Sequence, residues 1–266
     1  MTTPLGKALL DAKHPNYHEL VMRLLFCTTI VAGDSHYRIR EIEIYHVDDP
    51  YTHQGDEQVS STGGWYFHRT KPGGGWKGGT FMGLDISFAP IGTAGGVLIR
   101  GVSRIPKNGD SYQYIDGSCN CVREFLKACG VSKIKDLVSK SNFSWDALSP
   151  TGIFRLMEHE PMGTAGDPNS KKALNPKATM EWKAVSRIGL SEPNKFPEKA
   201  KARQKYHLAP LRFLQAPYET KKEKTKIKDA TKMGVFSNLE YNNINQASKD
   251  SSDDDDDDDD KKKAVM

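Results

Sequence analysis

The stretch "REIEIYHVDDPYTH", residues 40–53, contains the pattern that decides the fold. Its first half alternates apolar and polar residues, as a half-buried β-strand does. Ile42 and Ile44 share one face of this strand, while Glu41 and Glu43 share the other. Polar residues on one strand face usually meet solvent, and otherwise they line a pocket. The sequence leaves both alternatives open.

The second half of the stretch raises metal binding as an alternative. His46 and His53 are seven residues apart, with Asp48 and Asp49 between them. Adjacent aspartates on an extended segment point to opposite faces, so both cannot easily serve one ion. The spacing matches neither the His-Glu-x-x-His zinc pattern nor a calcium-binding EF-hand loop. We therefore predict no metal site here and interpret these residues as an acidic turn after a strand.

Other segments continue the alternation of strands and helices. Within residues 116–140 the apolar residues Val122, Phe125, Leu126 and Cys129 have helical spacing, and Gly130 fits a C-terminal cap, so we predict a helix that ends there. Residues 20–47 are interpreted as two strands joined by a turn at "GDS". Further strands are predicted at 81–88 ("FMGLDISF"), 95–105 ("GGVLIRGVSRI"), 182–190 ("WKAVSRIGL") and 210–214 ("PLRFL").

The C-terminal part of the chain has a different composition. Residues 219–266 are rich in lysine and then in aspartate, and they contain too little apolar surface to fold alone. We predict one domain over 1–218, followed by a disordered charged tail over 219–266. Residues 249–266 carry a net charge of −5, which leaves +9 for the first 248 residues of a chain with a total of +4. A basic body suits a polyanionic partner, although many other proteins are equally basic.

Length and composition exclude several classes of protein. A chain of 266 residues buries a proper core. No apolar run reaches the length of a membrane span, and no secretory signal is visible, so we expect an intracellular protein without a membrane partner. The four cysteines lack zinc-finger spacing, and we expect them to be reduced and structural. The lysine cluster at 221–228 is compatible with nuclear import, although such clusters are common.

Common catalytic motifs are missing from the chain. There is no Gly-x-Ser-x-Gly elbow, and "KPGGGWKGGT" lacks the Gly-Lys-Ser/Thr ending of a phosphate-binding loop. The catalytic arrangement that is still possible is a single carboxylate that activates a water molecule beside a cation. Glu43 is the candidate acid, and Arg100, in the apolar strand "VLIRG", is the candidate cation. A purely structural Glu–Arg pair is an equal alternative at this point.

Four motifs in the same order resemble the 3-methyladenine (alkyladenine) DNA glycosylase family, over most of residues 20–218. They are "REIEIY" for the family's strand with the catalytic acid, "GGVLIRGV" for its arginine strand, "GSCNCVREFLKACGV" for its helix, and "RIGL…PLRF" for its closing segment. This resemblance implies an α+β fold, in which a single domain has a curved, mostly antiparallel sheet and flanking helices.

The resemblance also implies a reaction and its residues. Glu43 would deprotonate a water, Arg100 would help to hold that water, and Tyr45 and His53 would form one wall of a pocket for an extruded base. The reaction would be hydrolysis of the N-glycosidic bond of a damaged purine in DNA, without a metal or another cofactor. We expect a monomeric DNA repair enzyme.

The chain departs from the family in two places. Asp85, in "LDIS", stands where the family has an asparagine that helps to exclude guanine. The glycine-rich "GGGWKGGTFMG", residues 73–83, replaces an aromatic hairpin. We expect Trp76 to replace a wall aromatic, and Lys77 or Phe81 to take the place of the side chain that is inserted into the duplex.

Basic residues between 195 and 205 are candidates for contacts to the nucleic-acid backbone. They are Lys195, Lys199, Lys201, Arg203 and Lys205, together with Lys77 further upstream. A solvated helix face is an equal alternative for this segment. Two further functions stay open: an N-glycosidase that acts on single strands or nucleotides, and a non-catalytic module that binds nucleic acid.

Overall fold

The structure is a computed structural model, and it describes residues 3–12, 16–53, 55–88, 90–106, 113–161, 180–190, 200–207, 209–215 and 231–236. The strands are β1 (Thr28–Ala32), β2 (Ser35–Tyr45), β3 (Trp65–Phe67), β4 (Leu84–Ser87), β5 (Gly96–Arg104), β6 (Gln113–Asp116), β7 (Phe154–Glu158), β8 (Met180–Val185), β9 (Arg212–Leu214) and β10 (Thr231–Phe236). The helices are α1 (Pro4–Asp11), α2 (His18–Phe26), α3 (Asp56–Ser60), α4 (Ser118–Ala128), α5 (Ile134–Val138), α6 (Ala200–His207) and the short 3₁₀ helix η1 (Gly79–Phe81).

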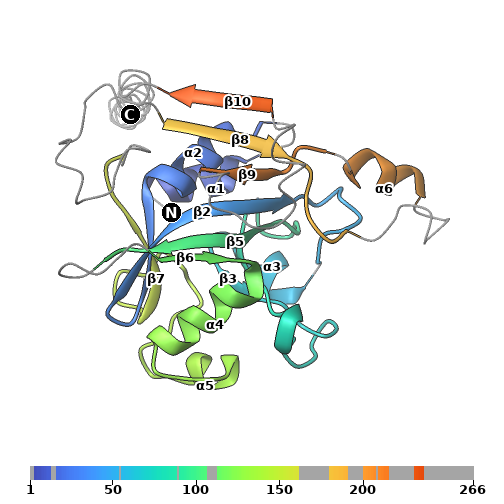
Figure 1. Ribbon diagram of the computed structural model, residues 1–266. Coiled ribbons are helices and arrows are strands. Elements are labelled where there is room, and N and C mark those ends of the chain that lie inside the picture. Colours follow the sequence, from blue (N-terminus) through green and yellow to red (C-terminus); the bar gives the residue numbers. More distant parts are fainter. Residues whose placement is uncertain are drawn as a thin grey trace, which may run out of the picture.

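All ten strands belong to one sheet, and every described strand pair is antiparallel. Its main path runs in the order β10-β8-β9-β2-β5-β4-β3, while β1 and β7 continue from β2, and β6 pairs with β5. The sheet curls, with helices placed around it (Figure 1). The predicted α+β fold with a curved, mostly antiparallel sheet is therefore confirmed.

One predicted strand is wrong. Residues 18–26 form helix α2, and only Thr28–Ala32 forms a strand in the first half of the predicted pair. A short apolar run does not distinguish a buried helix from a buried strand. Here leucine and methionine favour the helix, and Arg23 and Glu19 form an ion pair of 2.9 Å one helical turn apart. The β-branched residues begin only at Thr28.

Other predicted elements agree with the structure. Strands are present as β2, β4, β5, β8 and β9 within or across the predicted ranges, although the strand predicted at 182–190 ends at Val185 and the one predicted at 81–88 covers only Leu84–Ser87. Helix α4 ends where the pattern indicates, because Gly130 adopts a left-handed φ of 70° and its N–H donates to the Lys127 carbonyl. Residues 231–236 form β10, which pairs with β8, although they lie in the segment predicted as a tail. The rest of 219–266 lies outside the described residues.

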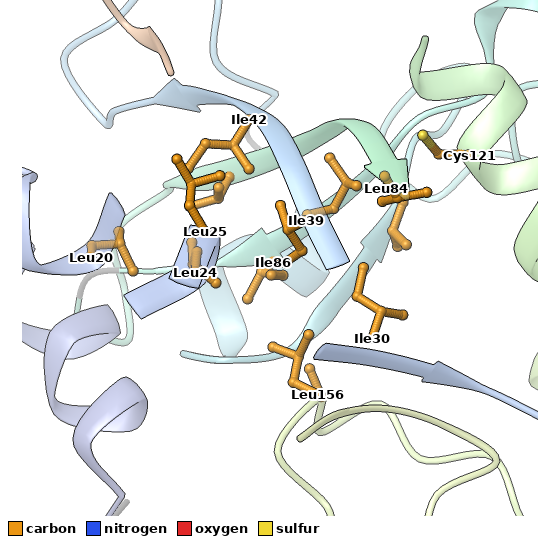
Figure 2. Packing of buried hydrophobic residues seen from close by; sticks show 14 of the residues in the cluster. Leu20, Leu24, Leu25, Ile30, Ile39, Ile42, Leu84, Ile86, Cys121 and Leu156 are labelled. Carbon is orange, nitrogen blue, oxygen red and sulfur yellow. The ribbon is translucent and has the colours of Figure 1, made fainter. Parts of the chain in front are cut away.

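The apolar face of the sheet forms the core. Cross-strand partners Ile44, Val97 and Ile86 continue to Trp65, and all four side chains are buried. Leucines of α2 gather on the same side as Ile42 (Figure 2). The core therefore covers one face of β2, β5 and β4 and holds these strands in a defined register.

The opposite face of β2 does not meet solvent. Glu41 and Glu43 are both 0% exposed, so the alternative of a solvated strand face is wrong. The pairing of β2 with β5 shifts register twice here. Ile39 is opposite Val102 and Glu41 is opposite Gly101, whereas Ile42 is opposite Ile99. Each strand thus contains one extra residue, Arg40 in β2 and Arg100 in β5. Such bulges redirect side chains and are common beside functional sites.

Candidate functional site

The register of four strand pairs places chemically different side chains in one row. Tyr66 is opposite Asp85, Asp85 is opposite Leu98, Leu98 is opposite Glu43, and Glu43 is opposite Arg212. Residues directly opposite each other on paired strands point to the same face. These five residues, which we call the polar row, cross β3, β4, β5, β2 and β9 on the face opposite to the core.

Glu43 is held from three sides. Its Oε2 accepts a hydrogen bond of 2.9 Å from the Tyr45 hydroxyl, and its Oε1 accepts one of 2.9 Å from the backbone N–H of Ile188. The Nε of Arg100 lies 3.7 Å from Oε1. Burial, followed by the neighbouring Glu43 charge, raises the pKa of Tyr45, which therefore stays a hydroxyl donor. The carboxylate thus has a fixed orientation.

Glu41 forms a second buried carboxylate beside the first. The Nε of Arg212 donates to its Oε1 at 2.7 Å, and the Tyr114 hydroxyl approaches its Oε2 at 3.4 Å. Arg100 Nε is 3.6 Å from Glu41 and makes no hydrogen bond among the described residues. Burial alone would lower the pKa of Arg100, but Glu43 and Glu41 outweigh it and raise that pKa. We call Glu41, Glu43, Arg100 and Arg212 the carboxylate–arginine cluster.

A buried ion pair covers the edge of this cluster. Asp49 and Arg187 form this pair, and Arg187 also donates to the Ile44 carbonyl at 3.0 Å. The Arg187 guanidinium lies 4.4 Å from the centre of the Tyr45 ring. Asp49 also accepts from the backbone N–H of Tyr51 at 3.0 Å, so it does act as a turn residue. Its pairing with Arg187 additionally joins the turn to a segment 138 residues further along the chain.

The other end of the polar row carries imidazoles around Asp85. Asp85 Oδ1 lies 2.8 Å from His68 Nε2, and its Oδ2 accepts a hydrogen bond of 2.8 Å from Gln58 Nε2. The rings of His53 and His68 are 4.6 Å apart, and His53 is 6.3 Å from the Tyr66 ring. The structure therefore brings the predicted residues His53 and Asp85 together. We call His53, His68, Asp85 and Gln58 the histidine–aspartate group.

Burial shifts the pKa of two rings at this end of the polar row. It lowers the pKa of His53 to about 4, with smaller contributions from the charges of His68 and Lys77. His53 is thus a neutral ring at pH 7. Burial also raises the pKa of Tyr66 to about 12, helped by Asp85. Both rings are therefore uncharged, which suits contact with a flat, weakly polar ligand.

The glycine-rich segment lies beside the histidine–aspartate group. The backbone N–H of Lys77 donates to the His68 carbonyl at 2.8 Å, and burial lowers the pKa of the Lys77 amine. Trp76 is half-buried and contacts the guanidinium of Arg69, 5.0 Å from its ring centre. Phe81, on η1, is 76% exposed. Lys77 is thus placed near His53 and Asp85, whereas Trp76 packs against the hydrophobic core and contacts Arg69.

The predicted backbone contacts fall into three groups. Lys201 and Lys205 on α6 are exposed. Arg203 on the same helix is buried, and its guanidinium lies 4.9 Å from the Tyr51 ring, so its described role is packing. Lys199 and Lys195 lie outside the described residues. An exposed position suits contact with phosphate, so Lys201 and Lys205 are the better placed candidates.

Several residues of the site were not predicted. Glu41 was noted on the strand face without a role, and Arg187 and Arg212 lie inside the quoted closing motifs "RIGL" and "PLRF". A charged residue inside an apolar strand is the pattern that would have identified Arg212. Gln58 and His68 have no such pattern, because only the strand register brings them to Asp85.

Features elsewhere in the described residues carry less chemistry. Two open depressions of about 530 and 730 Å³ lie along α4, and the lining of neither includes Glu43, His53 or Asp85. The four cysteines are free and buried. No group of three or more His, Cys, Asp or Glu side chains in the described ranges is arranged to hold a metal ion. None of the described helices has the length and apolarity to cross a membrane.

Comparison with known proteins finds no protein-family model and no curated protein that matches this chain. Membership of the glycosylase family therefore stays a prediction that rests on the four motifs.

Proposed function

We propose that this protein is a monofunctional DNA glycosylase that hydrolyses the N-glycosidic bond of a damaged purine. The observation that carries the proposal is the environment of Glu43. This carboxylate is fully buried, is oriented by Tyr45 and by a backbone N–H, and lies beside Arg100. A pure binding site has no need for a buried acid whose orientation is fixed from several sides.

The position of Arg100 supports a site for the attacking water. Its Nε lies 3.6 Å from Glu41 and 3.7 Å from Glu43, too far for hydrogen bonds to either. The Arg100 N–H is therefore left without a hydrogen-bond partner among the described residues, and we infer that it holds a water molecule next to Glu43. In this arrangement the water donates to Glu43 and accepts from the Arg100 N–H, which directs its free lone pair away from the carboxylate.

The reaction follows from these contacts. As the bond between the sugar C1′ and the base nitrogen breaks, its electron pair leaves with the base, and positive charge develops on the sugar. The water oxygen forms a bond to C1′ while Glu43 takes its proton. An alkylated purine carries a positive charge before this step and departs as a neutral molecule, which makes it a good leaving group. Arg100 compensates the buried carboxylate charge before the proton arrives.

The rest of the polar face supports the binding of a base. The side chains of Tyr45, His53 and His68 are half-buried, and the His53 ring is close to that of Tyr66. Aromatic rings of this kind stack on an extruded base. We infer that Phe81, exposed on η1, is the side chain inserted into the duplex, since an apolar wedge must project from the surface. Lys201 and Lys205 are proposed to contact the phosphate backbone.

The test compares wild type with Glu43→Gln on hypoxanthine- and 3-methyladenine-containing DNA, as duplexes and as single strands, with detection of abasic sites. Glu160→Gln, at an exposed glutamate, is the matched control. Release by wild type and Glu160→Gln but not by Glu43→Gln supports the proposal. Release from single strands alone indicates the single-strand N-glycosidase instead. Tight binding without release by any of the three proteins indicates a non-catalytic module.

A further inference from the structure

The histidine–aspartate group has more hydrogen-bond acceptors than donors. Asp85 is 2% exposed and Gln58 is 1% exposed. An ionised carboxylate accepts about four hydrogen bonds, and Asp85 uses two positions, for His68 and Gln58. The amide oxygen of Gln58 is buried and has no hydrogen-bond partner among the described residues. Asp85 and Gln58, which are joined by one hydrogen bond, thus both have acceptor capacity that no described residue uses.

The position of this acceptor pair relative to Glu43 is determined by the sheet. Asp85 on β4 and Glu43 on β2 are both opposite Leu98 on β5. Because neighbouring strands are about 4.8 Å apart, their backbones are separated by about 10 Å along the polar row. A purine whose sugar faces the water at Glu43, and whose ring extends along the row over Leu98, has its opposite edge toward Asp85.

Close packing against Gly96 fixes the positions of Asp85 and Gln58. Gly96 is next to Leu98 on the same strand face, opposite Tyr45 and Ser87. A Cβ atom there would lie 2.6 Å from Asp85 Oδ2 and 2.6 Å from Gln58 Nε2. The absence of a side chain at Gly96 thus allows the two acceptor-bearing residues to lie against the backbone of β5.

We propose that Asp85 and Gln58 select bases of the guanine type, whose edge opposite the glycosidic bond carries two adjacent N–H donors. Guanine presents its N1–H and its 2-amino group on that edge, while hypoxanthine presents N1–H alone. An adenine-type base presents an acceptor, N1, which the two oxygens would repel. A base that leaves these buried acceptors unpaired is disfavoured strongly, because the acceptors have already given up their hydrogen bonds to water. This inference rests on the proposed function and names its substrate class.

The test uses two bases that differ only in the 2-amino group. Single-turnover release of 7-methylguanine and 7-methylhypoxanthine is measured from oligonucleotides of the same sequence, after subtraction of the rate without enzyme. Wild type should release 7-methylguanine at least about tenfold faster, since one polar group of this kind discriminates strongly. Asp85→Asn should reduce that ratio at least about tenfold, because its amide can turn N–H donors toward the base. Asp11→Asn, at an exposed aspartate, should leave the ratio unchanged.

A binding measurement covers the case in which Asp85→Asn does not fold. Calorimetric titration of wild type and Gln58→Met with free guanine and free hypoxanthine should give tighter binding of guanine by wild type, and a smaller preference in the variant. Release of both methylated bases at equal rates, with no change in Asp85→Asn, would overturn the inference and leave the proposed function intact. Release of neither base, with no binding preference, would overturn the inference, and the proposed function would fall with it only if hypoxanthine and 3-methyladenine are not released either.

Discussion

The two ends of the polar row present opposite hydrogen-bonding character. In the carboxylate–arginine cluster the unused groups are donors, namely Arg100 Nε and both terminal nitrogens of Arg212, which have no hydrogen-bond partner among the described residues. In the histidine–aspartate group the unused groups are acceptors, on Asp85 and Gln58. Leu98 lies between the two ends and contributes an apolar side chain.

We infer from this difference that the two ends have separate tasks. Spare donors beside Glu43 suit a water molecule that must be held through its oxygen. Spare acceptors at Asp85 suit the N–H groups of a base. A buried polar group without a partner costs stability, and a ligand that pairs with Arg100 or Asp85 would offset part of this cost. We therefore propose catalysis at the Glu43 end and base recognition at the Asp85 end.

The largest effect should come from breaking the carboxylate–arginine cluster. Arg212→Met leaves the buried Glu41 without its 2.7 Å partner, and loss of one member of a buried ion pair costs about 3–5 kcal/mol of unfolding free energy. Urea denaturation followed by circular dichroism measures this loss. The double variant Glu41→Gln/Arg212→Met should lose less than the sum of the two single variants. Additive losses would mean that the pair is not an energetic unit.

A smaller loss should follow from crowding the histidine–aspartate group. In Gly96→Ala the new methyl meets Asp85 and Gln58 at 2.6 Å, and overpacking of this kind costs about 1–3 kcal/mol. Gly75→Ala is the control, because its methyl would meet nothing within 4 Å. Thermal unfolding of both variants tests the contrast. Equal melting temperatures for the two would show that Asp85 and Gln58 are not tightly held.

The protonation of His53 predicts a pH-dependent difference between wild type and variant. Its pKa is about 4 in the folded protein and 6.5 in the unfolded chain. Between these values the unfolded chain binds the proton, so the stability of the wild type falls as the pH decreases from 6.5 to 4. His53→Gln should avoid about 1–2 kcal/mol of this loss, a figure reduced for the partial exposure of the ring.

Denaturation curves at several pH values measure this difference. The same curves for His36→Gln, which removes an exposed histidine, are the control. Parallel loss of stability in His53→Gln and wild type would show that the ring is not held neutral at its end of the row.

The smallest effect on stability is expected outside the polar row. Phe81 is 76% exposed, so Phe81→Ala should change the unfolding free energy by less than about 0.5 kcal/mol. If Phe81 enters the duplex, the variant should release bases more slowly from duplexes than from single strands, relative to wild type. The same reduction on both substrates would contradict a wedge role and indicate a role at the base itself.

The elements that could be predicted are those whose patterns are local. Alternation along β2 and the glycine after α4 were sufficient, because each depends on near neighbours in the chain. Helix α2 was mistaken for a strand, because a short apolar run does not distinguish a buried helix from a buried strand. The bulges at Arg40 and Arg100 follow from the pairing of two distant strands and have no local pattern.

The candidate site divides in the same way. Glu43 and Arg100 could be proposed as a pair because motifs identified both, and the structure places them 3.7 Å apart. The partners of Asp85 could not be predicted, since Gln58 and His68 are separated from it by 27 and 17 residues. Only the register of β3, β4 and β5 brings such residues together.

The most direct test of the account is the single-turnover rate at which Glu43→Gln releases 7-methylguanine and 7-methylhypoxanthine. Glutamine keeps the shape of the side chain but cannot take the proton from water. We expect release of both bases to fall by the same factor, at least about 10²-fold, so that the ratio between them stays at the wild-type value. Release at the wild-type rate, or a loss confined to one of the two bases, would contradict the assignment of catalysis to Glu43.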